Sequence, residues 1–271
     1  MPVAFLTCYD PGMTVALKRY ALGGVVIVAA AVVALPFFLE TERRDLDNKA
    51  RSRAPGSFVE LTNGQVHYEL AGPEDGTLVV LVHGFSVPSF VWDPTFEKLL
   101  SQGFRVLRYD LYGRGYSDRP DVAYDRTLFV EQLRELLVEH GIEDPVDLVG
   151  LSMGGPVVGC FTSSYPERVS CLVFVDPFVG PAEAGVVAVP GIGEYVAAVY
   201  LSRALPTRLA EDFYRPERVP PWEGRFREQM RYRGFRRALL RSIRQFMAVD
   251  FSGLYAEVGR LDKPTLVAWG R

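Results

Sequence analysis

The stretch DLVGLSMGG, from Asp147 to Gly155, constrains the fold of this chain more than any other. A short apolar run leads into Ser152, with Gly150 two places before it and Gly154 two places after it. This is a G-x-S-x-G pattern between an expected strand and an expected helix. The turn is so tight that the serine backbone is strained and its hydroxyl projects above a sheet. We therefore expect Ser152 at the strand end, with glycines where a Cβ would clash.

Strand and helix patterns alternate along the rest of the chain. Five short apolar runs predict strands buried on both faces: TLVVLVHG, FRVLRYD, VDLVG, SCLVFVD and KPTLVAWG. Helical patterns lie between them, at Trp92–Gln102, Arg126–His140 and Ser152–Tyr165. Two alternating runs around Asn63-Gly64 predict a tight hairpin before them. The fold class is therefore α/β, with a mostly parallel sheet covered on both faces.

The alternation breaks between Pro177 and Leu261, where the sequence is helix-rich and punctuated by prolines. We interpret this stretch as a helical insertion that lies over the carboxyl ends of the strands, where ligands gather in such sheets. Its many arginines, from Arg225 to Arg244, are typical of a solvated helix face. An anionic membrane surface and a carboxylate-bearing substrate are the alternatives.

An uncharged apolar run of about 19 residues, Ala21–Leu39, predicts a transmembrane anchor, since a helix of this length reaches about 28 Å. A cleaved signal peptide and a buried core helix are the alternatives. The sequence PFFLETE lacks a small-x-small cleavage site, which favours the anchor. Basic residues flank the run on both sides, and we expect a single-pass protein with the catalytic domain outside the cytoplasm.

Composition narrows the classes of partner. The formal charge of −3 gives no excess of basic residues to meet a phosphate backbone, so no nucleic-acid partner is expected. The three cysteines have no C-x-x-C spacing and no companion histidines, so neither a metal site nor a disulfide framework is expected. The reaction considered below needs no cofactor.

The motif HGF, His83-Gly84-Phe85, closes the strand expected beside the one that ends at Ser152. The backbone N–H groups of Phe85 and Met153 are then placed to donate hydrogen bonds to an oxyanion. We expect His83 to shape this loop rather than to act as the base. The other two histidines, His67 and His140, are interpreted as packing or surface residues.

The segments LVHGF, YDLYGRGYSDRP, LVGLSMGG and FVDPF together resemble the α/β-hydrolase superfamily, in particular its single-domain lipase, esterase and carbon–carbon-bond hydrolase branch. The resemblance implies a helical cap after the sixth strand, Ser152 as nucleophile, and the amides of Phe85 and Met153 as oxyanion hole. It implies a site-shaping role for Asp110. Related dehalogenases and epoxide hydrolases carry Asp in place of the serine, so both activities are disfavoured.

A serine nucleophile needs a base, and the base needs an orienting acid. In the family that this chain resembles, both follow the strand that corresponds to KPTLVAWG. Here no histidine follows Ser152, and the sequence ends at Arg271. Asp176 stands where some relatives carry the acid. We expect a chain truncated at its C-terminus, without the last strand and helix. A non-catalytic, hydrolase-like binding protein is the competing hypothesis, and a dyad of Ser152 with His83 has little support.

The sequence thus predicts a membrane-anchored serine hydrolase that cleaves carboxylic esters, lipid-like ones included. Its small-molecule substrate is expected to contact apolar walls at Phe85, Trp92, Met153 and Phe178. The expected domains are an N-terminal segment at 1–20, the anchor at 21–39, a charged linker at 40–56, the hydrolase core at 57–177, the cap at 178–250, and a truncated return to the core at 251–271.

Overall fold

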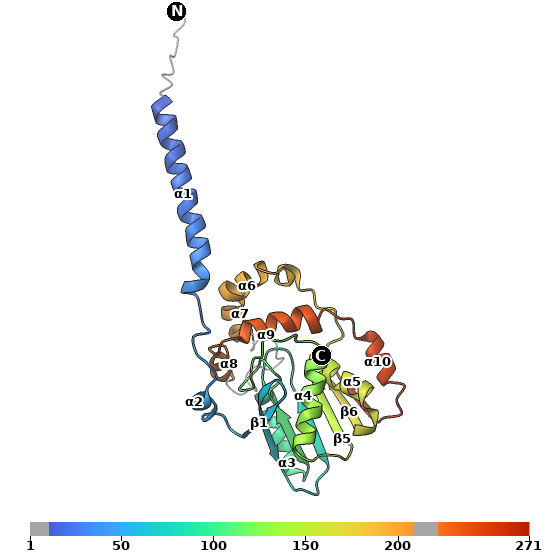
Figure 1. The fold of residues 1–271 in the computed structure, drawn as a ribbon. Coiled ribbons are helices and arrows are strands. Elements are labelled where there is room, and N and C mark those ends of the chain that lie inside the picture. The colour runs from blue at the N-terminus through green and yellow to red at the C-terminus, as the bar shows by residue number, and fades with distance from the viewer. Residues whose placement is uncertain (1–10, 209–221, 271) are drawn as a thin grey trace, which may run out of the picture. The chain divides into compact units, whose positions relative to one another are not determined.

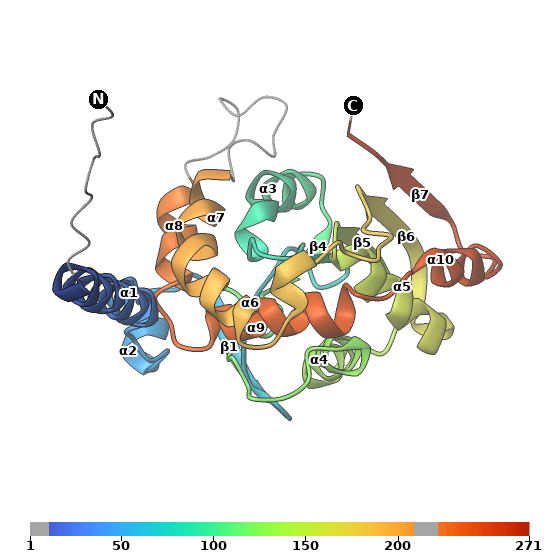
Figure 2. The ribbon, with the colours of Figure 1, turned by 90° about the horizontal axis from the view of Figure 1, so that it is seen from above.

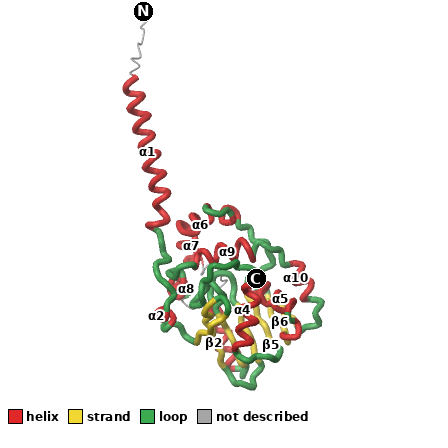
Figure 3. The backbone as a smooth tube through the Cα atoms, viewed as in Figure 1, coloured by secondary structure: helices red, strands yellow, loops and turns green. Residues whose placement is uncertain are grey.

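The computed structural model describes residues 11–208 and 222–270. The chain divides into two compact units, Met1–Glu40 and Thr41–Arg271. The second unit carries the sheet and its covering helices, which Figure 3 distinguishes by colour.

Within the described residues, the main element of the first unit is helix α1, Pro11–Phe38. Its segment Arg19–Phe38 is the one candidate membrane span among the described residues, by length and composition. Large apolar side chains are exposed along it, for example Val25, Ile27 and Val28. A helix that is apolar all round differs from the amphipathic helices that cover a soluble core. These properties are compatible with a membrane anchor and with a signal sequence.

The second unit is built on one sheet of seven strands in the order β1-β2-β4-β3-β5-β6-β7. The two N-terminal strands form the predicted hairpin, with Leu61 paired to Gly64, and β2 pairs antiparallel with β4. All later pairings are parallel. The strands are β1 (Ser57–Leu61), β2 (Gly64–Ala71), β3 (Leu78–Val82), β4 (Arg105–Tyr109), β5 (Val146–Leu151), β6 (Val169–Val175) and β7 (Thr265–Ala268). The predicted fold class is confirmed, and each of the five apolar runs forms a parallel strand.

Helices cover both faces of the sheet (Figure 2). One face packs against α3 (Asp93–Ser101), through a cluster that includes Leu81, Phe96 and Val106. The other face packs against α4 (Arg126–Glu139) and α5 (Gly154–Ser164), through the larger cluster. Successive residues of a strand point to opposite faces, so neighbours in β3 belong to different clusters. The predicted helices are confirmed, with ends that differ by at most two residues.

The stretch after β6 forms the cap above the carboxyl ends of the strands (Figures 1 and 2). Between Pro177 and Leu261, the described residues hold helices and no regular strand. The cap begins with a short helical turn, Gly185–Ala188, before its longer helices. These are α6 (Ile192–Val196), α7 (Ser202–Arg208), α8 (Glu223–Gln229) and α9 (Phe235–Arg241), after which the π-helical segment Ser242–Phe246 and α10 (Ser252–Val258) lead back to β7.

The arginines of the cap are more than a solvated face. Arg237 donates to the carbonyl of Arg119, and Arg241 donates to that of Val122. Arg244 donates to the carbonyl of Val187. The first two hydrogen bonds join the cap to loops of the core, and the third holds two parts of the cap together. The interpretation as a purely solvated face is therefore wrong for these residues.

Residues 41–47, here called the strap, are docked on the cap, whereas the sequence predicts a charged linker there. The Glu42 carboxylate accepts hydrogen bonds from the N–H groups of Gly234 (2.8 Å) and Arg236 (2.6 Å). Arg44 forms backbone hydrogen bonds with Arg231 and Arg233, and its side chain pairs with Glu228. The short helix α2 (Asn48–Arg51) follows. The difference arises because the charges of this segment find partners far away in the sequence.

Glu42 replaces a local N-cap for helix α9. Position Gly234 has no side chain to cap the helix, and its φ of 90° lies in the left-handed region that favours glycine. The carboxylate satisfies two N–H groups at the helix start and faces the positive end of the helix dipole.

We therefore expect Glu42→Ala to destabilise the second unit by about 1 kcal/mol, as loss of an N-cap does. The loss should appear as faster amide hydrogen exchange in α9. The control is Asp45→Ala, since the ion pair between Asp45 and Arg233 is largely exposed, at 72% and 64% of the two side chains. Exposed pairs contribute little. Equal exchange in α9 of both variants would contradict the capping role.

Candidate active site

Ser152 lies between β5 and α5 with a φ of 50°, one of two positive values among the described non-glycine residues. Its N–H donates to the carbonyl of Val175 at 3.0 Å. Its carbonyl accepts from the N–H groups of Gly155 and Phe178, each at 2.9 Å. Strained backbone of this kind persists only where the surroundings fix it, and it is concentrated at functional sites. These three hydrogen bonds fix the turn.

The flanking glycines are required by close backbone contacts. A Cβ on Gly150 would lie 2.5 Å from the carbonyl oxygen of Gly154. A Cβ on Gly154 would lie 2.3 Å from the carbonyl oxygen of Val82, at the end of β3. Real Cβ atoms do not approach backbone atoms so closely. A side chain at Gly150 would therefore distort the turn, and one at Gly154 would push the turn away from β3. The G-x-S-x-G pattern thus has a steric cause in this structure.

The HGF loop lies directly against the serine. A Cβ on Gly84 would be 3.2 Å from the Cβ of Ser152 and 3.7 Å from its Oγ. In the part of the chain that the structure describes, neither the N–H of Phe85 nor that of Met153 donates a backbone hydrogen bond. Met153 is fully buried. An unsatisfied N–H in such a position costs about 1–3 kcal/mol, which an oxyanion acceptor would recover.

Arg114 is a fully buried side chain that contacts both candidate donors, and sequence reasoning missed it. It donates to the carbonyl of Phe85 at 2.8 Å and lies 4.0 Å from the Met153 sulfur. It also donates to Ser242 of the cap at 2.8 Å. Burial lowers its pKa to about 10, so it stays charged at neutral pH. Its position in GRGYSD gave no signal, because its partners are distant in sequence.

Asp110 is the acceptor that organises the loop around it. Its carboxylate accepts from the N–H (2.9 Å) and Oγ (2.7 Å) of Ser89 and from the N–H of Tyr116 (2.9 Å). It also pairs with Nδ1 of His67 at 2.8 Å. Burial alone would raise the pKa of Asp110, but His67 and the Ser89 hydrogen bond hold it well below its ordinary value. The position fits the site-shaping role that the resemblance implies.

His67 is a buried imidazolium rather than a surface residue. Its ring nitrogens face the carboxylate of Asp110 and the carbonyl of Pro55. Both partners only accept, so both nitrogens carry hydrogen. Burial lowers the pKa of His67, but Asp110 and Pro55 more than offset this, and the net shift is upward.

The other two histidines are also engaged away from the serine hydroxyl. His83 Nδ1 bonds the carbonyl of Gly84 at 2.8 Å, and its Nε2 accepts from the N–H of Leu111 at 2.9 Å. Burial lowers its pKa to about 4, so it is neutral. His140 stacks edge-on against Tyr68, with ring centroids 4.4 Å apart. No histidine of the described chain has a ring nitrogen that bonds Ser152.

Asp176 follows β6 with a φ of 41° and is exposed. Its carboxylate accepts from the N–H of Gly270, after β7. The two positive-φ residues, Ser152 and Asp176, therefore end neighbouring strands. Strand β7 lies at the sheet edge, and Leu266 within it (59%) and Trp269 directly after it (62%) are exposed.

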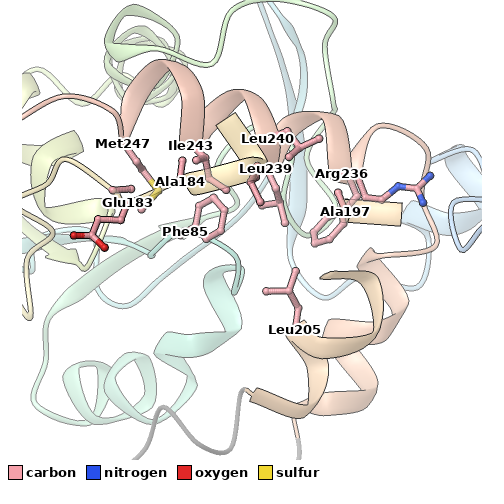
Figure 4. Close-up of a pocket in the computed structure, with 13 residues that line it drawn as sticks. Phe85, Glu183, Ala184, Ala197, Leu205, Arg236, Leu239, Leu240, Ile243 and Met247 are labelled. Carbon is pink, nitrogen blue, oxygen red and sulfur yellow. The ribbon is translucent and has the colours of Figure 1, made fainter. Parts of the chain in front are cut away.

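An apolar cavity of about 250 Å³ lies under the cap, beside the oxyanion loop. In Figure 4, Leu239, Leu240, Ile243 and Met247 project from α9 and the following segment, with Phe85 below and Leu205 opposite. The remaining lining residues are Ala182, Glu183, Ala184, Val187, Ala197, Phe235 and Arg236.

Of the four pocket walls expected from sequence, the cavity contains only Phe85. Trp92 ends the 3-10 turn Ser89–Trp92, directly before α3, and packs with Val79 and Phe96 in the cluster on the α3 face. Met153 points into the core, and Phe178 packs against Phe251. The cap residues that do line the cavity had no signal beyond helical apolar spacing. No cluster of three or more His, Cys, Asp or Glu side chains suited to a metal occurs in the described ranges.

The chain is similar in sequence to a known family of hydrolases. A model described as "Alpha/beta hydrolase family" matches residues 79–271. Carboxylesterase YbfK of Bacillus subtilis is 31% identical over 141 residues, which cover 52% of this chain and 46% of that protein. Five of the curated relatives are matched over only 39–46% of their own length, so the chain spans less than half of each.

Solved structures of hydrolases also match this chain, and these matches cover a larger share of it. A hydrolase from Pseudomonas aeruginosa PA01 is 27% identical, with a TM-score of 0.65, and the match covers 80% of this chain and 81% of that one. A thermophilic esterase from Thermogutta terrifontis is 26% identical, with a TM-score of 0.59, and the match covers 80% of both chains.

The pair of His67 and Asp110 predicts a pH dependence of stability. The pKa of His67 is raised in the folded state, so its contribution is complete below the ordinary 6.5 and is lost as the pH rises through the folded pKa. The pKa of Asp110 is lowered, so its contribution is complete above the ordinary 3.8 and is lost at lower pH. The stability advantage of the native chain over His67→Asn should be largest between about pH 4 and 6.5 and shrink towards pH 9.

The measurement is chemical unfolding of both proteins across this pH range. The control is His140→Asn, because burial lowers the pKa of His140 and reverses the sign. That variant should gain stability relative to the native chain as the pH falls below 6.5. A His67→Asn difference that does not vary with pH would show that His67 is neutral in the folded protein.

Proposed function

The chain belongs to the alpha/beta hydrolase family, and from this premise we propose that it contributes the nucleophile and oxyanion hole of a serine hydrolase acting on carboxylic esters. The observation that carries the proposal is the turn at Ser152. Ser152 has a positive φ and lies against the loop that contains Phe85. Within the described part of the chain, the backbone N–H groups of Phe85 and Met153 both lack a backbone acceptor and are free to bind an oxyanion. The name of the Bacillus carboxylesterase supports an ester as the substrate class.

In the proposed reaction, Ser152 Oγ attacks the ester carbonyl carbon while a base takes the hydroxyl proton. The carbonyl oxygen becomes an oxyanion, and the N–H groups of Phe85 and Met153 stabilise it. One such donor is worth about 2.7–4 kcal/mol of barrier in a characterised serine protease. The tetrahedral intermediate then expels the alcohol, which receives the proton from the base. Water then attacks the acyl carbonyl carbon while the base takes a proton from the water. The second tetrahedral intermediate expels Ser152 Oγ, which receives this proton, and the carboxylic acid is released.

The base is the remaining requirement. His67 and His83 use both ring nitrogens elsewhere, and His140 lies against Tyr68. We therefore propose that the proton acceptor comes from outside the described residues. Asp176 remains a candidate acid, since it ends the strand next to that of Ser152, but its carboxylate cannot replace an imidazole.

The lining of the cavity indicates which kind of acyl chain the substrate carries. Its wall is almost entirely apolar, and Phe85 lies both in this wall and in the proposed oxyanion hole. An ester whose carbonyl oxygen meets the N–H of Phe85 would place an apolar chain in the cavity. We propose a lipid-like ester as substrate, and α1 as a single-pass anchor that holds the catalytic unit outside the cytoplasm.

A second candidate function is ligand binding without catalysis. The observation in its favour is the engagement of the three histidines away from Ser152. The cavity would then hold an apolar ligand, and the strained turn at Ser152 would be retained without a chemical step.

Covalent labelling separates the two candidates. The native chain should react with a fluorophosphonate probe at Ser152, and the rate should rise with imidazole concentration at constant pH and ionic strength. Imidazole supplies the proton acceptor that the three histidines do not provide. Ser152→Ala should abolish labelling, whereas Ser170→Ala, an exposed serine that bonds the carbonyl of Pro145, should leave it unchanged. Intact-mass spectrometry measures the adduct.

Labelling of Ser152→Ala at the native rate would place the nucleophile elsewhere. A folded native chain that stays unlabelled at every imidazole concentration would favour the binding candidate. Rapid labelling without imidazole would show that a base is already present within the chain.

Filling the cavity tests the acyl site. Ile243→Trp should reduce the labelling rate with a dodecyl fluorophosphonate by about tenfold, since excluding two methylenes costs about 1.6 kcal/mol. The rate with an ethyl fluorophosphonate should change little. Val138→Trp is the control, because Val138 lies on the exposed side of α4, at 53% exposure. An equal loss with both probes would show that the substitution disturbs the turn at Ser152 instead.

A further inference from the structure

The cap carries an exposed apolar loop that the reaction at Ser152 does not use. Residues Gly185–Ile192, here called the cap loop, have the sequence GVVAVPGI and contain no charged side chain. Seven of the eight are exposed, and Val186 (58%), Val189 (44%) and Ile192 (52%) are among the large apolar side chains on the surface. Contiguous apolar surface of this kind marks an interaction site.

The cap loop is apolar on both sides. Val187 of the loop lines the cavity under the cap, as does Ala184, which directly precedes the loop. A segment that covers a cavity in water normally presents polar side chains on its outer side. Here the outer side consists of valine, alanine, proline and isoleucine. The charge of the nearby Glu194 is balanced by Arg244, with which it forms an ion pair at 2.6 Å.

The strap follows helix α1 in the chain after a few residues, and it is bound to the cap. Glu42 is fastened to the start of α9 by two hydrogen bonds. Only three residues separate it from Phe38, the last residue of α1. Four Cα–Cα steps span at most about 14 Å. The segment that follows α1 in the chain is therefore fastened to the cap.

We propose that the cap loop docks on the surface of a lipid bilayer, with Val186, Val189 and Ile192 in its interfacial region. The proposal rests on the anchor role of α1 given under the proposed function. A helix that crosses the bilayer, tied by the strap to the cap, holds the cap at the membrane surface. An uncharged loop at that surface gains free energy by burying its apolar side chains among lipid chains.

Docking of this kind also defines where the substrate enters. Val187, in the same loop, lines the cavity beside Phe85. A lipid ester leaving the bilayer would pass the cap loop before its carbonyl reaches Ser152, without crossing bulk water. The loop is therefore both the membrane contact and one wall of the entry path.

Fluorescence quenching tests the docking in the full chain. The three native cysteines are replaced by alanine, and Ile192→Cys carries an environment-sensitive NBD label in phosphatidylcholine vesicles. Vesicles that contain lipids with a doxyl group near the headgroup should quench this label at least twofold more than one at Val138→Cys. The position Val138 has similar exposure (53%) and lies on α4, away from the cap. Blue-shifted emission should accompany the quenching at residue 192.

A second comparison tests the chemistry of the contact. Val189→Asp should lower the quenching at residue 192 to the level at residue 138, because a carboxylate is costly in the interfacial region. Val138→Asp makes the same change at a matched exposed valine and should leave the quenching unchanged.

Three outcomes would overturn the docking, and a fourth would separate it from the catalytic role. Equal, weak quenching at both positions in vesicle-bound protein would leave the anchor in place but show that the loop faces water. A blue shift without doxyl quenching would show that protein, such as a second copy, covers the loop. Loss of the chain from vesicles on alkaline washing would remove the anchor and the docking together. Failure of Ser152 to label, with strong quenching, would leave the docking intact and remove only the catalytic role.

Discussion

The close approach of the Ser152 turn to the end of β3 is the constraint on which the rest of the site depends. Gly154 lies so near the carbonyl of Val82 that no side chain fits between them. This contact sets the distance between the serine and the loop that begins at His83. The nucleophile and the loop with the unused N–H of Phe85 are therefore positioned by one steric contact, and neither can shift without the other.

Two buried charges fix the surroundings of this contact. Asp110 gathers hydrogen bonds from three directions and holds the imidazolium of His67. Among the described residues Arg114 has neutral hydrogen-bond partners, namely two carbonyls, the hydroxyl of Ser242 and the sulfur of Met153, so its burial costs more than that of a paired ion. A buried cation without a carboxylate is retained here beside the proposed oxyanion, where its positive charge favours negative charge on a bound substrate.

Sequence reasoning found the features that local patterns determine. The apolar runs gave the parallel strands, and G-x-S-x-G with HGF gave the turn and its neighbouring loop. It did not find Arg114 or the capping of α9 by Glu42, because each depends on contacts across more than a hundred residues. It misplaced Trp92 for a related reason: an aromatic residue after a strand can pack on either face of the sheet, and only the tertiary structure decides which.

These long-range contacts also join into one path. Glu42 caps the first turn of α9, and the helical segment that continues from α9 contains Ser242, which accepts a hydrogen bond from Arg114. Arg114 in turn holds the carbonyl of Phe85. Helical backbone transmits a displacement at one end to the other because its hydrogen bonds keep it rigid. The strap and the residue that holds the proposed oxyanion loop thus contact opposite ends of the same helical segment, so the position of that segment is fixed from both sides.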